Sequence, residues 1–210
     1  DNCTIQGCEI DTNEVDGISI SQSADSIITQ NTIHDNFDAN SDGIIVQNCN
    51  PEISRNTIYD NRFNISLQAD SGDITSPTIK NNLIYQVTSG EVTYGILMGG
   101  AGTTSPKIYH NTIDGGGEDG INISGTGNAP HIKYNIITGF GDYGVYNQNG
   151  NPVIDYNDVW NNTGRTYFGC TPGNNNISAD PQYASYTLAA TSPCINAIDE
   201  DEAAEDPVIL

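Results

Sequence analysis

Isoleucine, asparagine and proline recur along this chain at fixed distances from one another. Five prolines mark the repeat, at spacings of 26, 29, 24 and 22 residues. An Ile lies two residues after each Pro, and another Ile or Val lies seven residues after it. The asparagines five residues after each Pro are Asn56, Asn82, Asn111, Asn135 and Asn157, and the earlier Ile28, Asn31 and Ile33 fit the same frame. We place a partial repeat before these, with Ile5 in register and Cys3 at the Asn position.

A second signature, Asp-Gly-Ile-x-Ile or a variant of it, occupies the other half of each repeat. Its copies are Asp16–Ile20, Asp42–Val46, Asn64–Leu67, Tyr94–Met98, Asp119–Ile123 and, more weakly, Tyr143–Tyr146. Each repeat therefore contains three short segments in which alternate residues are apolar, which is the pattern of half-buried strands. One repeat cannot bury its own apolar face, whereas stacked repeats form a continuous core. The pattern predicts an all-β solenoid, a parallel β-helix of about seven coils with three short strands each.

The asparagine column has a structural interpretation. Asn tolerates left-handed backbone geometry at a corner, and stacked side-chain amides can hydrogen-bond along the axis. Other solenoids fit poorly, because the chain lacks both the Leu-x-x-Leu-x-Leu core of leucine-rich repeats and a hexapeptide period, and its repeat is too short for a propeller blade.

Charge narrows the range of partners. Six Lys and Arg face 27 Asp and Glu, which gives a formal net charge of −21. Nucleic-acid binding requires a clustered basic surface, so we expect no nucleic-acid partner. Direct binding of a polyanionic glycan is also disfavoured unless a divalent cation bridges the two. With 22 Gly and 26 Asn, the composition suits many corners rather than long helices.

The five cysteines show neither a Cys-x-x-Cys pair nor zinc-ligand spacing, and with only three His a transition-metal site is not expected. An odd number leaves at least one free thiol, and we expect Cys170 and Cys194, both near the C-terminal end, to be able to pair. No apolar run is long enough to span a bilayer, so we expect no membrane insertion. The chain begins without Met in the middle of a repeat, and we interpret it as part of a longer chain.

The combination of Asn-Thr-Ile and Asp-Gly-Ile resembles the coils of the pectin-lyase-like superfamily over roughly residues 2–160. This resemblance implies the right-handed form of the parallel β-helix. Ala179–Tyr183, Tyr186–Leu188 and Ser192–Ala197 also resemble the closing segment of secreted bacterial and archaeal surface proteins that carry a C-terminal anchor region. The resemblance implies one domain over 1–198, capped by about 161–198, with 199–210 as an acidic tail or linker and an extracellular or cell-surface location.

The superfamily includes polysaccharide lyases, glycoside hydrolases, adhesins and non-catalytic stalks, so membership does not define an activity. Asn111–Asp114 and Glu118–Gly120 resemble two motifs of inverting polygalacturonases, but Gly-His-Gly and Arg-Ile-Lys are absent. Acid and base carboxylates could come from Asp114, Glu118, Asp119 and Asp142, near the corner before the third strand. Lys80 and Lys133 share one coil position, but other coils place Tyr109 and Asp155 there, as on an ordinary surface.

Two further groups of residues are candidates for binding. Asp16, Asp42, Asp119 and Asp142 are expected at equivalent positions before the third strand, where Asp favours a turn before Gly and neighbouring carboxylates could bind Ca²⁺. Exposed aromatics stack on sugar faces, and the candidates are Tyr85, Tyr94, Tyr143, Tyr146 and Trp160, near the corner insertion at Val87–Thr93 and in the last coils. Closure of the core beneath the C-terminal cap is an equally open alternative for these aromatics.

Two hypotheses about function remain open. The first is an extracellular β-helix module, not catalytic by itself, with a structural, adhesive or glycan-binding role toward a polysaccharide or cell-envelope glycan. The alternative is a polysaccharide lyase or glycoside hydrolase. No cofactor is required by the first, and Ca²⁺ is the one ion that the acidic row suggests.

Overall fold

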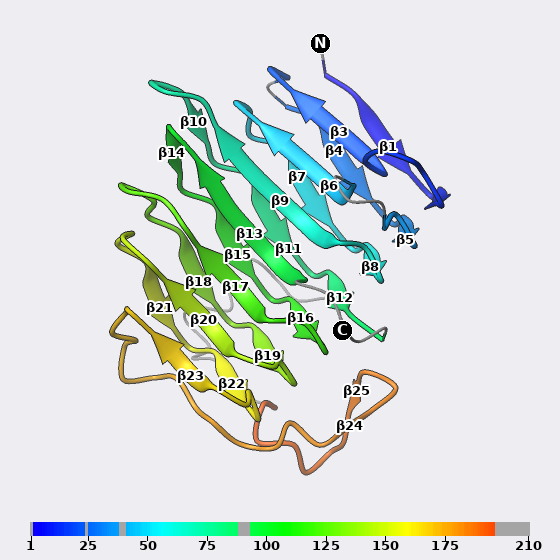
Figure 1. The fold of residues 1–210 in the computed structure, drawn as a ribbon. Helices are drawn as coiled ribbons and strands as arrows, with labels where there is room; N and C mark the ends of the chain where they lie inside the picture. Colours follow the sequence, from blue (N-terminus) through cyan, green and yellow to red (C-terminus); the bar gives the residue numbers. More distant parts are fainter. Residues whose placement is uncertain (1, 24, 38–40, 88–92, 196–210) are drawn as a thin grey trace.

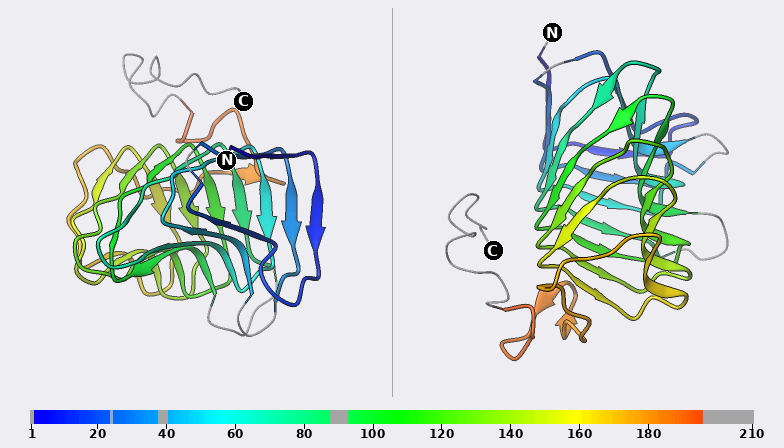
Figure 2. Two further views of the ribbon diagram at one scale, coloured as in Figure 1. Left: turned by 90° about the horizontal axis from the view of Figure 1, so that it is seen from above. Right: turned by 90° about the vertical axis from the view of Figure 1, so that its left-hand side faces the viewer.

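The chain folds into a solenoid of three parallel β-sheets, seen in a computed structural model that describes residues 2–23, 25–37, 41–87 and 93–195 (Figure 1). Each of the three sheets has seven strands, so the expected seven coils of three short strands are confirmed. No helix occurs among the described residues. Figure 2 shows the coils stacked side by side along a single axis.

The first sheet carries the strands that follow each proline. Its members, in order along the stack, are β1 (Thr4–Gln6), β4 (Ile27–Thr29), β7 (Glu52–Ser54), β11 (Thr78–Lys80), β15 (Lys107–Tyr109), β18 (His131–Lys133) and β21 (Val153–Asp155). The central residue of each strand points inward, since Ile28, Ile53 and Ile79 are completely buried.

The second sheet follows directly after the asparagine corner. Its members are β2 (Glu9–Asp11), β5 (Thr32–His34), β8 (Thr57–Tyr59), β12 (Leu83–Tyr85), β16 (Thr112–Asp114), β19 (Ile136–Thr138) and β22 (Asp158–Trp160). The register pairs Ile10 with Ile33 and Ile5 with Ile28. Cys8, not Cys3, therefore occupies the Asn position of the first coil, and the register assigned to that coil from sequence was one strand off.

The third sheet has the longest strands. Its members are β3 (Ile18–Ser21), β6 (Asp42–Gln47), β9 (Phe63–Ala69), β13 (Tyr94–Gly100), β17 (Asp119–Ile123), β20 (Tyr143–Asn147) and β23 (Arg165–Phe168). Two short parallel strands, β10 (Ile74–Thr75) and β14 (Thr103–Thr104), lie at the corner after β9 and β13. The inward residues of all three sheets form one core of Ile, Leu, Val and Met columns, and burial of each large aliphatic side chain contributes about 1.5–3 kcal/mol.

The asparagine column forms a continuous ladder of hydrogen bonds. The side-chain Oδ1 of Asn82 accepts both the backbone N–H and the side-chain amide of Asn56, at 2.9 and 3.0 Å, and the Asn82 amide donates in turn to Asn111 Oδ1. The ladder runs from Asn31 to Asn157 and continues to Asn176 beyond the last coil. Each amide thus satisfies backbone groups that the corner removes from the sheets.

Left-handed geometry at this corner belongs to a different residue than expected. The residue immediately before each ladder Asn has positive φ, between 55° and 61°, at Gln30, Arg55, Asn81, His110, Tyr134 and Tyr156. The ladder Asn must direct its amide inward to bridge coils, so the preceding residue makes the turn. The hydrogen bonds predicted for Asn at the corner are therefore present, whereas the left-handed φ predicted for Asn was wrong.

The C-terminal segment covers the last coil and then turns away. Ile177 pairs in parallel with Asp158, and its N–H donates to Asn157 O at 2.8 Å. An antiparallel hairpin of β24 (Tyr183–Ala184) and β25 (Thr187–Leu188) follows (Figure 1). The predicted cap at about 161–198 extends beyond the described residues at its end, and the predicted tail at 199–210 lies outside them.

All five cysteines are free thiols, and the pairing expected for Cys170 and Cys194 was wrong. Cys170 packs against the core at the end of β23, whereas Cys194 Sγ lies 3.1 Å from Asp158 Oδ2 below the second sheet. Proximity at one end of the chain did not bring the two sulfurs together, because the segment between them crosses from one sheet to another.

Candidate functional site

The outer face of the third sheet presents two columns of side chains where β13, β17 and β20 lie side by side. Alternation directs Ile96, Ile121 and Val145 into the core and the residue after each of them outward. The residue two positions before each also lines the outer face, at the start of the strand. The first outward column contains Tyr94, Asp119 and Tyr143, and the second contains Leu97, Asn122 and Tyr146. Glu118 and Asp142 precede the strands at neighbouring corners, and the N–H of Asp142 donates to Glu118 O at 2.8 Å.

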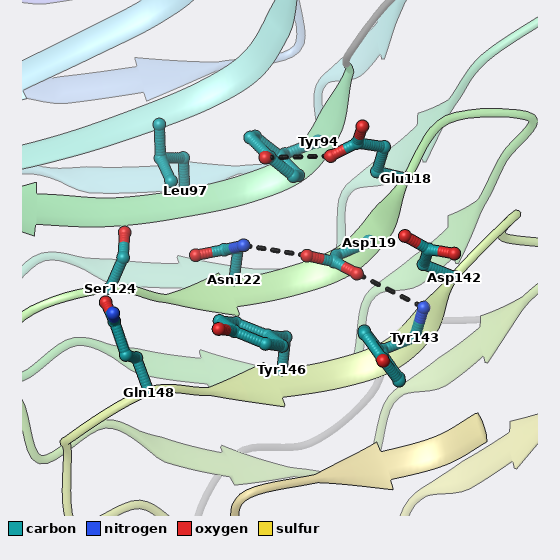
Figure 3. A pocket seen from close by; sticks show the side chains of 10 residues that line it. All are labelled: Tyr94, Leu97, Glu118, Asp119, Asn122, Ser124, Asp142, Tyr143, Tyr146 and Gln148. Carbon is teal, nitrogen blue, oxygen red and sulfur yellow. Dashed lines mark hydrogen bonds between the residues drawn. The ribbon is translucent and has the colours of Figure 1, made fainter. Parts of the chain in front are cut away.

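These residues line a hollow of about 440 Å³ on the surface of coils four to six (Figure 3). Its lining consists of Tyr94, Leu97, Glu118, Asp119, Asn122, Ser124, Asp142, Tyr143, Tyr146 and Gln148. Three of the four acids proposed as catalytic candidates and three of the five aromatics proposed for glycan binding therefore meet here. Neither Lys nor Arg is among the lining residues.

Asp119 lies at the floor of the hollow and is 4% exposed. Its Oδ1 accepts the backbone N–H of Tyr143 at 3.1 Å, and its Oδ2 accepts the Asn122 amide at 2.7 Å. Burial raises the pKa of Asp119 to about 6, since desolvation disfavours the charged carboxylate more than these two bonds favour it, and the negative charges of Asp142 and Glu118 add to the rise. Both oxygens are thus already engaged, Oδ1 by the next coil and Oδ2 by a neighbour within β17.

Glu118 and Asp142 are the more accessible acids. Glu118 Oε2 accepts the hydroxyl of Tyr94 at 3.0 Å, and burial followed by this bond raises the pKa of Tyr94. Asp142 is exposed, and its side chain makes no hydrogen bond with any described residue. These two carboxylates give the hollow negative charge, and no Lys or Arg is among its lining residues, although Arg165 is the neighbour of Tyr143 on β23.

Asp142 does not belong to the aspartate row in which it was placed. The pairing of Ile121 with Val145 puts Tyr143, not Asp142, opposite Asp119. Asp142 falls one position earlier, opposite Glu118, because the sixth copy of the signature reads Tyr-Gly-Val rather than Asp-Gly-Ile. The row therefore contains Asp16, Asp42 and Asp119 only, interrupted by Phe63 and Tyr94.

Asp114 lies on a different sheet and is the one catalytic candidate outside the hollow. Its Oδ1 accepts the hydroxyl of Thr138 at 2.7 Å, and Thr138 Oγ1 lies 2.6 Å from the hydroxyl of Tyr183 in the C-terminal hairpin. Asp114 borders a smaller hollow of about 230 Å³, together with Trp160 and Asp180.

The aromatic side chains form separate groups rather than one surface. Tyr146 and Phe168 stack with ring centroids 5.2 Å apart and an interplanar angle of 6°. The ring centroid of Tyr143 lies 5.0 Å from that of Phe168. Tyr85 instead stacks on Tyr59 on the second sheet. Trp160 borders the smaller hollow, and of the insertion at Val87–Thr93 only its two ends lie within the described residues.

Sequence reasoning missed Phe168 and Asn122. Phe168 belongs to the last strand of the third sheet, where Arg-Thr-Tyr-Phe replaces the Asp-Gly-Ile signature, and only the register with Tyr146 identifies it. Asn122 lies inside a copy of the signature that was assigned to the repeat, and its outward position could have been read from strand alternation.

Three potential metal ligands converge at one place within the part of the chain that the structure describes. Glu9, Asp11 and His34 bring one ligand atom each within 4.8 Å of one another. Burial lowers the pKa of His34, but hydrogen bonds to the carboxylates of Asp35 and Glu9 outweigh this effect, and the net shift of the pKa is upward. An imidazolium surrounded by carboxylates accounts for this cluster. Calcium binding by Asp16, Asp42, Asp119 or Asp142 stays a prediction.

The architecture defines a class of protein, the β-solenoid of parallel coils with an inward asparagine ladder. Comparison with known proteins gives the family. A family model described as "Right handed beta helix region" matches residues 1–135, more than half of the chain, and the chain belongs to this family. The right-handed parallel β-helix expected from sequence is thereby confirmed, and the pectin-lyase-like superfamily fits. No curated protein and no solved structure matches the chain.

No helix in the described residues is both long and apolar enough to cross a membrane.

Proposed function

We propose that this chain is an extracellular or cell-surface β-helix module that binds a polysaccharide or cell-envelope glycan in the hollow across β13, β17 and β20, without cleaving it. The observation that carries the proposal is the stacked pair of Tyr146 and Phe168, extended by Tyr143, beside polar groups of the hollow. Flat aromatic faces flanked by hydrogen-bonding groups match a sugar ring, which has an apolar face and a polar edge.

The environment of Asp119 supports binding rather than cleavage. Asp42 occupies the same column, is 5% exposed, and has its pKa raised to about 6 by burial, as Asp119 does. A raised pKa that recurs at an equivalent position of the repeat, away from the hollow, is a property of the coil. In addition, hydrogen bonds from Tyr143 and Asn122 engage both oxygens of Asp119.

Hydrolysis of a glycan is the second candidate, because Glu118 and Asp142 lie at neighbouring corners on either side of Asp119. A buried acid of raised pKa beside further carboxylates is the arrangement that general acid catalysis requires. A lyase mechanism on uronates is disfavoured, because no Lys or Arg lines the hollow to act as base or to neutralise the substrate.

The binding test compares two aromatic truncations against a panel of neutral and charged oligosaccharides. Tyr146→Ala should weaken binding by about tenfold, since loss of a stacking face costs about 0.5–1.5 kcal/mol. Trp160→Ala should leave the affinity unchanged, because Trp160 borders the smaller hollow. Weaker binding in Trp160→Ala but not in Tyr146→Ala would move the site to the second sheet. If neither variant weakens binding, both locations are refuted.

Cleavage is tested on the same panel by measuring reducing ends and unsaturated products. New reducing ends that disappear in Glu118→Gln and Asp142→Asn would overturn the non-catalytic proposal in favour of a hydrolase. If no member of the panel is cleaved while binding is retained, the result supports a binding module.

A further inference from the structure

The charged groups of the hollow are hydrogen-bond acceptors, whereas the hydroxyls of Tyr143 and Tyr146 can both donate and accept. The hydroxyl of Tyr94 donates to Glu118, and that of Ser124 donates to Met98 O at 3.1 Å, which leaves their oxygen lone pairs facing a ligand. Glu118 and Asp142 contribute carboxylate oxygens, and Gln148 is the one lining side chain with an amide donor to offer. A ligand that complements this lining must bring donors.

Asn122 adds a buried carbonyl oxygen that receives no hydrogen bond. The side chain is 7% exposed, and its Oδ1 has no hydrogen-bond partner among the described residues. The bond from its Nδ2 to Asp119 Oδ2 fixes the amide orientation, so the carbonyl points away from Asp119, toward the side of the hollow where Ser124 lies (Figure 3). An unsatisfied buried carbonyl is unfavourable, and a ligand donor that reaches it would remove this cost.

Charge and aromatic faces favour the same ligand. No Lys or Arg lines the hollow, so the charges of Glu118 and Asp142 repel uronates and attract cations. The faces of Tyr143 and Tyr146 carry the negative potential of aromatic rings, which attracts an ammonium group. A single metal ion suits the hollow less well. Where three candidate metal ligands of the described residues do converge within 4.8 Å, they are Glu9, Asp11 and His34, none of which lines the hollow.

We infer that the hollow recognises an amino sugar, a glycan whose sugar rings carry protonated amines, through Glu118, Asp142, the Asn122 carbonyl and the tyrosine faces. This inference rests on the proposed glycan binding and names its ligand class. The amine supplies both a positive charge and donors for the two carboxylates and the Asn122 carbonyl.

The test is calorimetric titration of the intact chain with four probes of equal length: tetramers of glucosamine, N-acetylglucosamine, glucose and galacturonate. At about pH 6 and low salt, where screening is weak, we expect the glucosamine tetramer to bind at least about tenfold more tightly than the other three. We expect this preference to shrink as salt is added.

Two variants isolate the charge. Asp142→Asn and Glu118→Gln keep the shape of the hollow, and each should reduce the preference for glucosamine about fivefold while the affinity for the glucose tetramer holds. Glu14→Gln, an exposed acid in the first corner region, removes the same charge elsewhere and should leave the preference intact. Unfolding curves of all variants verify that each is folded.

The outcomes separate the two proposals. Equal affinity for the glucosamine and glucose tetramers would overturn the amino-sugar inference and leave glycan binding standing. Tighter, calcium-dependent binding of the galacturonate tetramer would overturn it in favour of an ion-bridged uronate. If no probe binds, both the inference and the proposed glycan binding fail.

Discussion

Asp42 and Asp119 occupy the same column of the third sheet, separated by Phe63 on β9 and Tyr94 on β13. Both aspartates are almost fully buried, and burial raises the pKa of each to about 6. At Asp42, burial is the main cause of this rise, and the charge of Asp16 adds to it. Two equivalent positions of the repeat thus share an electrostatic environment although only one of them lines the hollow.

This shared environment predicts a pH-dependent stability. The folded protein holds the Asp42 proton more tightly than the unfolded chain does, so the stabilisation is present below about pH 4 and is lost as pH rises to about 6. Asp42→Asn cannot ionise and should become more stable than the original protein by up to about 3 kcal/mol above this range. Urea unfolding of both proteins from acid to neutral pH measures the difference. A difference that does not change with pH would contradict the prediction, and Glu14→Gln serves as the exposed control.

The asparagine ladder predicts a large cost for a single truncation. In Asn82→Ala, the N–H and amide of Asn56 lose their acceptor, and Asn111 Oδ1 and Ile53 O each lose a donor. Leaving buried groups unsatisfied should lower the free energy of unfolding by about 3 kcal/mol. Chemical denaturation measures this cost. Asn81→Ala changes the neighbouring corner residue outside the ladder and should cost less, so equal costs would argue against the ladder as the stabilising element.

Positive φ before the ladder predicts an unusual preference for glycine. Arg55 has φ 57°, where a side chain costs about 1–2 kcal/mol relative to glycine. Arg55→Gly should therefore be more stable than Arg55→Ala by about 1 kcal/mol, the reverse of the order in a regular strand. Both variants lose the same charge, so their difference isolates the backbone. Equal stability, or greater stability of the Ala variant, would show that the corner relaxes out of left-handed geometry.

The free thiols predict a distinct labelling pattern. Cys3 and Cys8 are exposed and should react rapidly with an alkylating reagent, whereas buried Cys49 should react only on unfolding. Burial, and the hydrogen bond to Asp158 after it, raises the pKa of Cys194 to about 12, so its thiolate is scarce and its reaction slow. Mass spectrometry after labelling in denaturant should count five modified thiols. A count of three would indicate a disulfide.

The periodicity of Ile, Asn and Pro by itself determined the solenoid, its seven coils, its three strands per coil and its asparagine ladder. Each of these follows from local spacing, because residues at one position of every repeat must stack in one column. The sequence also selected Glu118, Asp119, Asp142, Tyr94, Tyr143 and Tyr146 as candidates, although it could not show that they meet.

Tertiary structure decided the register of individual coils and the contacts across sheets. Repeats of 22 to 29 residues differ in corner length, and the sequence alone does not fix how each corner is spanned. The sequence-based prediction therefore put Asp142 into the aspartate row by an error of one residue, and Cys3 at the Asn position by an error of one strand. Only the pairing of β20 with β23 placed Phe168 on Tyr146. Likewise, only the bond from Asp119 fixed the direction of the Asn122 carbonyl. Such contacts depend on which residues are neighbours in space, and variable corners leave that information out of the local pattern.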